Sequence, residues 1–197
     1  MIQHFRSFLF LTACALPLIS PLAAQGLSLE MDPAQSKVEF TLGATLHTVH
    51  GSFQFKRGAI RFDPASGKAS GELLVDARSA VSGNDSRDHK MHTEILESQR
   101  FPDILFRPDH VEGKLAPQGI SQIQVHGVFA IHGSEHELTA PVEVRVSGGQ
   151  YAITARFAVP YQKWGMKNPN TFLLRVDDHA DITLHTVAHA MIQLPSH

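Results

Sequence analysis

Histidine is the side chain in this sequence that could most readily bind a metal ion or transfer a proton, and the chain has 13 of them. Where two fall in a segment that alternates like a strand, as at His47 and His50, they point to opposite faces. His132 and His136 differ, because they flank a turn at residues 133–135 and could face each other across a hairpin. A metal at this pair stays open, although none is expected there.

A second candidate chemistry is proton transfer by His89 and His92, which are i and i+3 neighbours in a polar segment that also carries Asp88. A hydrolase or isomerase acting on an amphiphilic substrate could use them as acid or base. The familiar motifs are missing, however. The segment HELTA lacks the second histidine of a zinc protease motif, and there is no G-x-S-x-G elbow, phosphate-cradling glycine loop or C-x-x-C-H. We therefore expect a protein that is not an enzyme, with no catalytic residues, no metal and no cofactor.

Two polar clusters could bind a ligand without performing a reaction. The first consists of Asn84, Arg87, Asp88 and Lys90, and the second lies in the loop KWGMKNP at residues 163–169. Loops on a rigid scaffold commonly carry binding groups. The same residues could equally serve as a helix cap, an ion pair and a loop anchor.

The segment at residues 82–106 interrupts a chain that otherwise alternates like a series of strands. Ser82 or Asn84 can cap a helix there, and Met91 and Ile95 would share one face of that helix. A helix with one apolar edge among amphipathic strands most simply lies across a sheet or closes the end of a barrel.

Alternation of apolar and polar residues predicts the strands that must position these groups. Val38, Phe40 and Leu42 share one face of an early strand, and the clearest strand covers residues 138–146, where Pro141 suggests an edge or a bulge. The same alternation recurs at residues 51–56, 60–63, 73–75, 104–106, 123–125, 151–159, 172–176 and 180–184. About eight to ten short strands predict an all-β antiparallel barrel or sandwich, and a barrel of about eight strands can hold one small ligand.

Residues 1–24 have the pattern of a secretory signal peptide: one basic residue, Arg6, an apolar run, and small residues before Gln25. A membrane anchor is the alternative. Against it, Pro17 and Pro21 interrupt a run that is shorter than the roughly 20 residues needed to span a bilayer.

Cys14, the only cysteine, lies in a sequence like a lipoprotein cleavage site, so lipidation is another alternative. The apolar residues that would then begin the mature chain argue against it. We expect residues 25–197 to form one domain that is periplasmic or secreted after cleavage. The net charge of −2 and the lack of any block of like charges disfavour nucleic acid or an anionic membrane surface as a partner.

Several segments taken together resemble the YceI family of secreted, lipocalin-like, polyisoprenoid-binding proteins. In chain order they are MDPAQSKVEF, GATLHTVHGSF, IRFDP, GNDSRD, FPDILF, FAIHG and WGMKNP, and the resemblance runs from Met31 to about Leu184. It implies an eight-stranded antiparallel barrel with a helical insertion, holding the long isoprenoid tail of a quinone or a polyprenyl phosphate. The chain departs from commoner members at residues 89–92, which read HKMH, where those members have a histidine followed by leucine after the Arg-Asp pair.

Inward positions and polar loops supply the candidate ligand-binding residues. The candidates for the wall are Phe40, Leu42, Phe53, Phe55, Ile104, Phe106, Phe157 and Phe172. The candidates for the mouth are Asn84, Arg87, Asp88, Trp164 and Asn168. Arg87 could also simply pair with Asp88 or with a loop carbonyl.

The predicted function is a periplasmic binding or carrier protein for a long-chain polyisoprenoid lipid, which meets a membrane only transiently as the source of that lipid. A homodimer through an exposed strand edge stays open. The alternatives are the histidine enzyme and a stress-related structural module, whose mark would be a filled core without a cavity.

Overall fold

The computed structural model describes residues 26–45, 47–169 and 175–191, and antiparallel strands account for most of these residues. In these ranges the strands are β1 (Leu27–Met31), β2 (Lys37–Gly43), β3 (Thr48–Phe62), β4 (Ala69–Val81), β5 (Asp103–Glu112), β6 (Gly119–Ile131), β7 (Ser134–Ser147), β8 (Gln150–Val159) and β9 (Ala180–Ala190). The helices there are η1 (Pro33–Gln35), α1 (Asp85–Lys90) and η2 (Met91–Ile95). None of these helices is long and apolar enough to cross a membrane.

The sheet closes into a barrel because β3 pairs with β4. β1 and β2 share one position in this barrel, since both pair with β3 on one side and with β9 on the other. η1 separates them at Pro33, which has no N–H, and the Asp32 side chain accepts a hydrogen bond of 2.8 Å from the Ala34 N–H. The described strands therefore occupy eight positions, which confirms the predicted antiparallel barrel.

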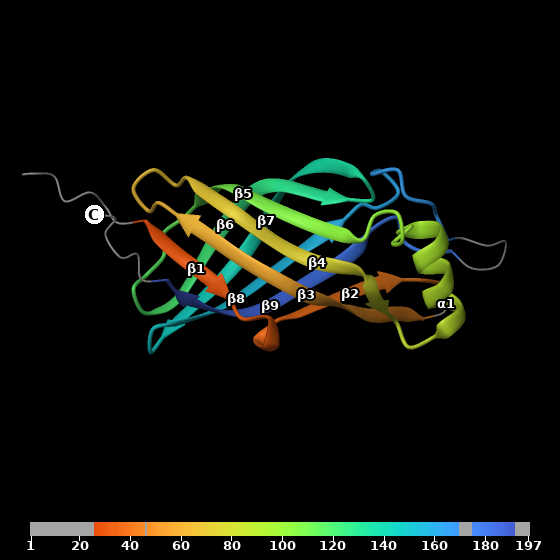
Figure 1. Ribbon diagram of the computed structural model, residues 1–197, viewed down its shortest axis with the longest axis horizontal. Helices are drawn as coiled ribbons and strands as arrows, with labels where there is room; N and C mark the ends of the chain where they lie inside the picture. Colours follow the sequence, from red (N-terminus) through yellow and green to blue (C-terminus); the bar gives the residue numbers. More distant parts are fainter. Residues whose placement is uncertain (1–25, 46, 170–174, 192–197) are drawn as a thin grey trace, which may run out of the picture.

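The two ends of the barrel differ in their connections (Figure 1). At one end, short turns join β3 to β4 and β7 to β8. At the other end, the connection between β4 and β5 contains α1 and η2, and residues 160–179 connect β8 to β9. We call this second end the α1 end, because α1 lies across it (Figure 1). The prediction of a helical insertion at the end of a barrel is confirmed.

The insertion begins as the sequence predicts, with Asn84 rather than Ser82 as the cap. The Asn84 side-chain oxygen accepts a 2.9 Å hydrogen bond from the Arg87 N–H. Met91 and Ile95 pack together against the core cluster at this end of the barrel. Residues Met91–Ile95 form a π-helix, a local widening for which the sequence carries no recognisable signal.

One part of the wall is paired on a single side. β7 pairs with β8 only from Val142 to Ser147, so its residues 134–141 pair with β6 alone. We call residues 134–141 the β7 seam. Pro141, which has no N–H to donate, lies where the pairing with β8 stops. This confirms the edge that Pro141 suggests in the sequence.

Other segments differ from the prediction. β1, a strand of five residues beside the predicted signal peptide, is not predicted from the sequence. β3, which is predicted as two separate strands, is one strand of 15 residues with register shifts near Gln54 and Lys56. Of the strand predicted at residues 172–176, positions 170–174 lie outside the described residues, and Val176 makes one isolated bridge with Ala44. Residues 1–24, including Cys14, also lie outside them.

Gly127 supports the bulge between β5 and β6, where the register shifts between Pro108 and His110. A methyl group at Gly127 would lie 2.3 Å from the Arg107 carbonyl oxygen and 2.7 Å from the Pro108 Cα, so backbone would have to move. We expect Gly127→Ala to lower the free energy of unfolding by about 1–3 kcal/mol, measured by urea denaturation. In the matched control, Gly26→Ala places its methyl at an ordinary 3.4 Å from the Phe62 carbonyl. Equal stability of the two variants would contradict the assigned role of Gly127.

Candidate functional site

The barrel encloses a cavity of about 570 Å³. Its lining runs from Arg87 and Met91 at the α1 end to Leu27 and Leu115 at the opposite end. This volume lies in the range of ligand pockets rather than of packing defects. The cavity therefore extends along the barrel.

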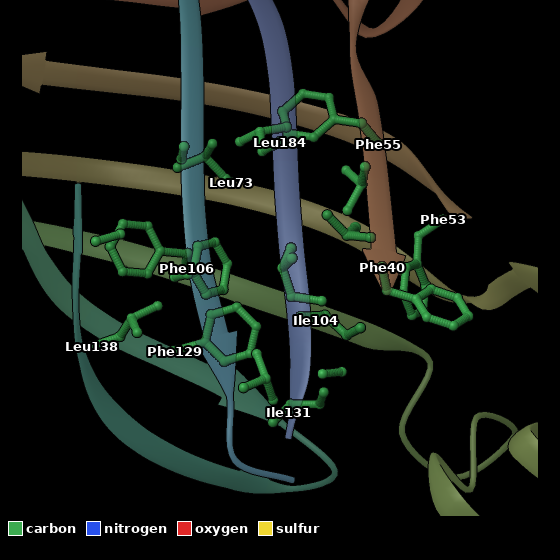
Figure 2. A pocket seen from close by; sticks show the side chains of 18 of the residues that line it. Phe40, Phe53, Phe55, Leu73, Ile104, Phe106, Phe129, Ile131, Leu138 and Leu184 are labelled. Carbon is green, nitrogen blue, oxygen red and sulfur yellow. The ribbon is translucent and has the colours of Figure 1, made fainter. Parts of the chain in front are cut away.

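Inward-pointing apolar side chains form the wall of the cavity, because alternate residues of each strand face the interior. Figure 2 shows such side chains from several strands projecting into the space between them. Seven of the predicted wall residues line the cavity: Phe40, Leu42, Phe53, Phe55, Ile104, Phe106 and Phe157. Phe172 lies outside the described residues. Whether these side chains bind a ligand stays a prediction.

Aromatic rings contribute much of this wall. The Phe40 and Phe53 ring centroids lie 5.4 Å apart with a tilt of 55°, and those of Phe129 and Phe157 lie 5.8 Å apart nearly edge to face. Phe129 and Leu73 line the cavity as well, although they are absent from the predicted set. Leu73 belongs to an alternating segment, whereas Phe129 lies in the apolar run VFAI at residues 128–131, which does not alternate.

Polar groups on the lining gather at the α1 end. They are His47, Ser82, Asn84, Ser86, Arg87, Lys90 and Tyr161. Toward the other end the lining includes Thr186, whose hydroxyl is hydrogen-bonded to the Ser36 hydroxyl at 2.6 Å. No aspartate or glutamate is among the described residues that line the cavity. The lining thus has a cationic end and an apolar body.

Arg87 and Asp88 hold the start of the insertion through Ser82. Arg87 donates from Nε to the Ser82 hydroxyl at 2.6 Å and from Nη2 to the Ser82 carbonyl at 2.8 Å. Asp88 accepts from the Ser82 N–H at 2.9 Å and from its hydroxyl. Burial opposes ionisation of Asp88, but these hydrogen bonds and the neighbouring Arg87 hold the pKa of that carboxyl below its usual value.

Of this pair, only Arg87 lines the cavity. Its hydrogen bond to the Ser82 carbonyl confirms the loop-carbonyl alternative for its role. Asp88 instead accepts hydrogen bonds from the N–H and the hydroxyl of Ser82, the residue that Arg87 also binds. Contact of either residue with a ligand stays a prediction.

Trp164 lies against the β7 seam instead of on the cavity lining. Its ring stacks on His136, with centroids 4.2 Å apart and planes within 2°, and its centroid lies 5.7 Å from that of Phe129. Asn168 is not on the lining either, although Met166 and Pro169 of the same loop are. Of the residues predicted at the mouth, Asn84 and Arg87 therefore line the cavity, whereas Asp88, Trp164 and Asn168 do not.

The two histidines at the hairpin point to different partners. His132 Nε2 lies 3.2 Å from Glu97 Oε1, and its ring packs against Phe101 at 4.9 Å. His136 stacks on Trp164, and its Nε2 atom is buried without a hydrogen-bond partner among the described residues. Across residues 26–45, 47–169 and 175–191, no group of three His, Cys, Asp or Glu side chains is placed to hold a metal ion.

The helix histidines are also outside the cavity lining. His92 uses both ring nitrogens, with Nε2 2.9 Å from the Ala80 carbonyl and Nδ1 2.9 Å from the Ser98 hydroxyl. His89 is exposed and borders a separate surface depression together with Arg78 and His92. This arrangement positions them as structural groups, so it offers no acid–base pair facing the cavity.

A closed antiparallel barrel with a long apolar cavity and polar groups at one end defines a lipocalin-like class of small-molecule-binding protein. The family model described as "YceI-like domain" matches residues 29–188. The chain therefore belongs to the YceI-like family, as the resemblance in the sequence predicts.

Solved structures share this fold at low sequence identity. Burkholderia cenocepacia BcnA is 20% identical with a TM-score of 0.68, covering 80% of this chain and 98% of its own. A polyisoprenoid-binding domain from Saccharophagus degradans is 14% identical with a TM-score of 0.66, covering 84% of this chain and 99% of its own. The Campylobacter jejuni YceI protein is 16% identical with a TM-score of 0.58, covering 76% and 88%. No curated protein matches the sequence.

The contact between His136 and Trp164 should make stability sensitive to acid. Burial lowers the pKa of His136 from its ordinary value of 6.5. The unfolded chain therefore binds this proton more readily, and stability is lost as the pH falls below about 6.5. We expect His136→Phe, which keeps an aromatic ring against Trp164, to lose less stability than the parent protein between pH 7.5 and pH 5.5. Thermal unfolding at the two pH values measures this, and equal losses in both proteins would contradict it.

Proposed function

We propose that this protein binds a long-chain polyisoprenoid lipid, with the tail along the barrel and the head group at the α1 end. The observation that carries the proposal is the continuous cavity of about 570 Å³, apolar along its body and polar where α1 covers it. A lipid with one polar end and one long apolar chain matches this division.

The energetics favour a flexible apolar chain over a compact polar molecule. A tail of about forty carbons contributes roughly 12 kcal/mol at about 0.3 kcal/mol per heavy atom. Such a sum needs surface contact along the whole tail, and the lining supplies it from Phe40 and Phe53 near the α1 end to Leu27 and Leu115 at the other. The cavity also disfavours the filled-core structural module.

Binding without catalysis is the simplest role for this site. No carboxylate lines the described cavity, and both ring nitrogens of His92 are engaged by the protein. Membership of the YceI-like family supports the same view, as does the fold shared with the Saccharophagus degradans domain named for polyisoprenoid binding.

Location in the periplasm is part of the proposal, with the lipid taken from a membrane. It rests on the signal-peptide pattern at residues 1–24. We expect the chain recovered from the periplasmic fraction of an expressing bacterium to begin at Gln25, as read by intact mass. A full-length chain confined to the cytoplasm would overturn the proposed location. A chain that begins at a lipid-modified Cys14 would mean that the protein is anchored to a membrane instead of free in the periplasm.

Enlarging the wall tests lipid binding itself. Ala155 is buried on the cavity lining, whereas Ala152 of the same strand is exposed on the outer face. We expect Ala155→Phe to reduce uptake of a labelled polyprenol by about tenfold or more, because the ring occupies the space of the tail.

Ala152→Phe is the matched control, since it adds the same ring outside the barrel, and it should leave uptake unchanged. Circular dichroism and urea unfolding verify that both variants fold. Equal uptake by the two folded variants would mean that the tail does not occupy the barrel.

A further inference from the structure

Two cations stand on the cavity lining at the α1 end. Arg87 and Lys90 are i and i+3 neighbours on α1, so they share one face of the helix. Both are half-buried, and both line the cavity. They carry the formal positive charge of the described lining, in a protein whose net charge is −2.

The two cations are not equivalent. The Arg87 guanidinium donates hydrogen bonds to Ser82 from Nε and Nη2. The Asp88 carboxylate accepts a hydrogen bond from the N–H of the same serine. Lys90 has no hydrogen bond or ion pair from its ammonium group in the part of the chain that the structure describes. The exposed carboxylates nearest in sequence, Asp85 and Glu94, are not on the cavity lining.

A half-buried ammonium group at the mouth of an apolar cavity has lost part of its hydration without gaining an anion. An anionic oxygen from a ligand would compensate it through a charge-assisted hydrogen bond, whereas a neutral carbonyl would leave the charge uncompensated. Ser86 and the amide of Asn84 line the same region and can donate further hydrogen bonds. A group with several acceptor oxygens and a negative charge therefore fits this end best.

We propose that the head group is a phosphate ester, so that the protein selects polyisoprenoid phosphates over quinones and polyprenols, and that Lys90 is the residue that makes this selection. The inference rests on the proposed function, because it concerns the head of a lipid whose tail fills the barrel. Arg87, which is held by Ser82, adds to the positive electrostatic potential at this end of the cavity. Lys90 supplies the positive charge that has no partner within the described protein.

The test compares three probes with the same tail of about forty carbons: a polyprenyl monophosphate, the matching polyprenol, and a quinone. We expect the parent protein to bind the monophosphate about tenfold or more tightly than the other two, as one hydrogen bond to a charged group implies. Lys90→Leu, which keeps a good helix former, should weaken monophosphate binding by about tenfold and so remove most of that preference. Lys114→Leu is the matched control, because it removes the same charge from an exposed site at the opposite end.

The failures of the two proposals can be told apart. Binding of all three probes with equal affinity, unaffected by Lys90→Leu, would overturn the phosphate inference while lipid binding stands. Binding of none of them by folded protein would overturn both. Inorganic phosphate should not displace the lipid at comparable concentration. If inorganic phosphate bound with the same affinity as the polyprenyl monophosphate and displaced it, the site would be one for a soluble anion, and the inference would be wrong.

Discussion

Closure of the sheet between β3 and β4 is the constraint on which the rest of the structure depends. A closed barrel has to enclose every inward side chain of its strands, and about eight strands leave an interior near the limit of what side chains can fill. In this chain the rings of Phe40, Phe53, Phe129 and Phe157 line the space but leave about 570 Å³ of it open. The cavity is thus a product of strand number and side-chain choice together, because larger residues at positions such as Ala155 would reduce it.

Polarity along the axis gives this space a direction. The strand connections at the α1 end bring Asn84, Arg87 and Lys90 to the lining, whereas the lining at the opposite end includes apolar residues such as Leu27 and Leu115. Ser82 is central to this difference between the two ends of the cavity. It accepts hydrogen bonds from the Arg87 guanidinium and donates hydrogen bonds to the Asp88 carboxylate. One short polar turn therefore fixes both the helix that covers the barrel and the charge that faces its interior.

Much of this was readable from the sequence, because the alternation that predicts a strand also predicts which of its residues face inward. That reasoning finds the insertion, the edge at Pro141, seven lining residues, and two possible helix caps, Ser82 and Asn84, of which Asn84 is the one used. It misses β1, whose five residues are too short a pattern beside a predicted signal peptide. It also groups Trp164 with the mouth, since nothing local indicates that a ring in one loop stacks on His136 from a strand 28 residues earlier. The cavity itself depends on how side chains from distant strands share a volume, which no single segment encodes.

The most direct test of the account is the mass of the protein purified from its own compartment, recorded under native conditions and followed by solvent extraction of whatever is bound. The account predicts an added mass that extracts as a long isoprenoid. Bare protein that also fails to take up added polyprenyl phosphates, polyprenols or quinones would contradict it.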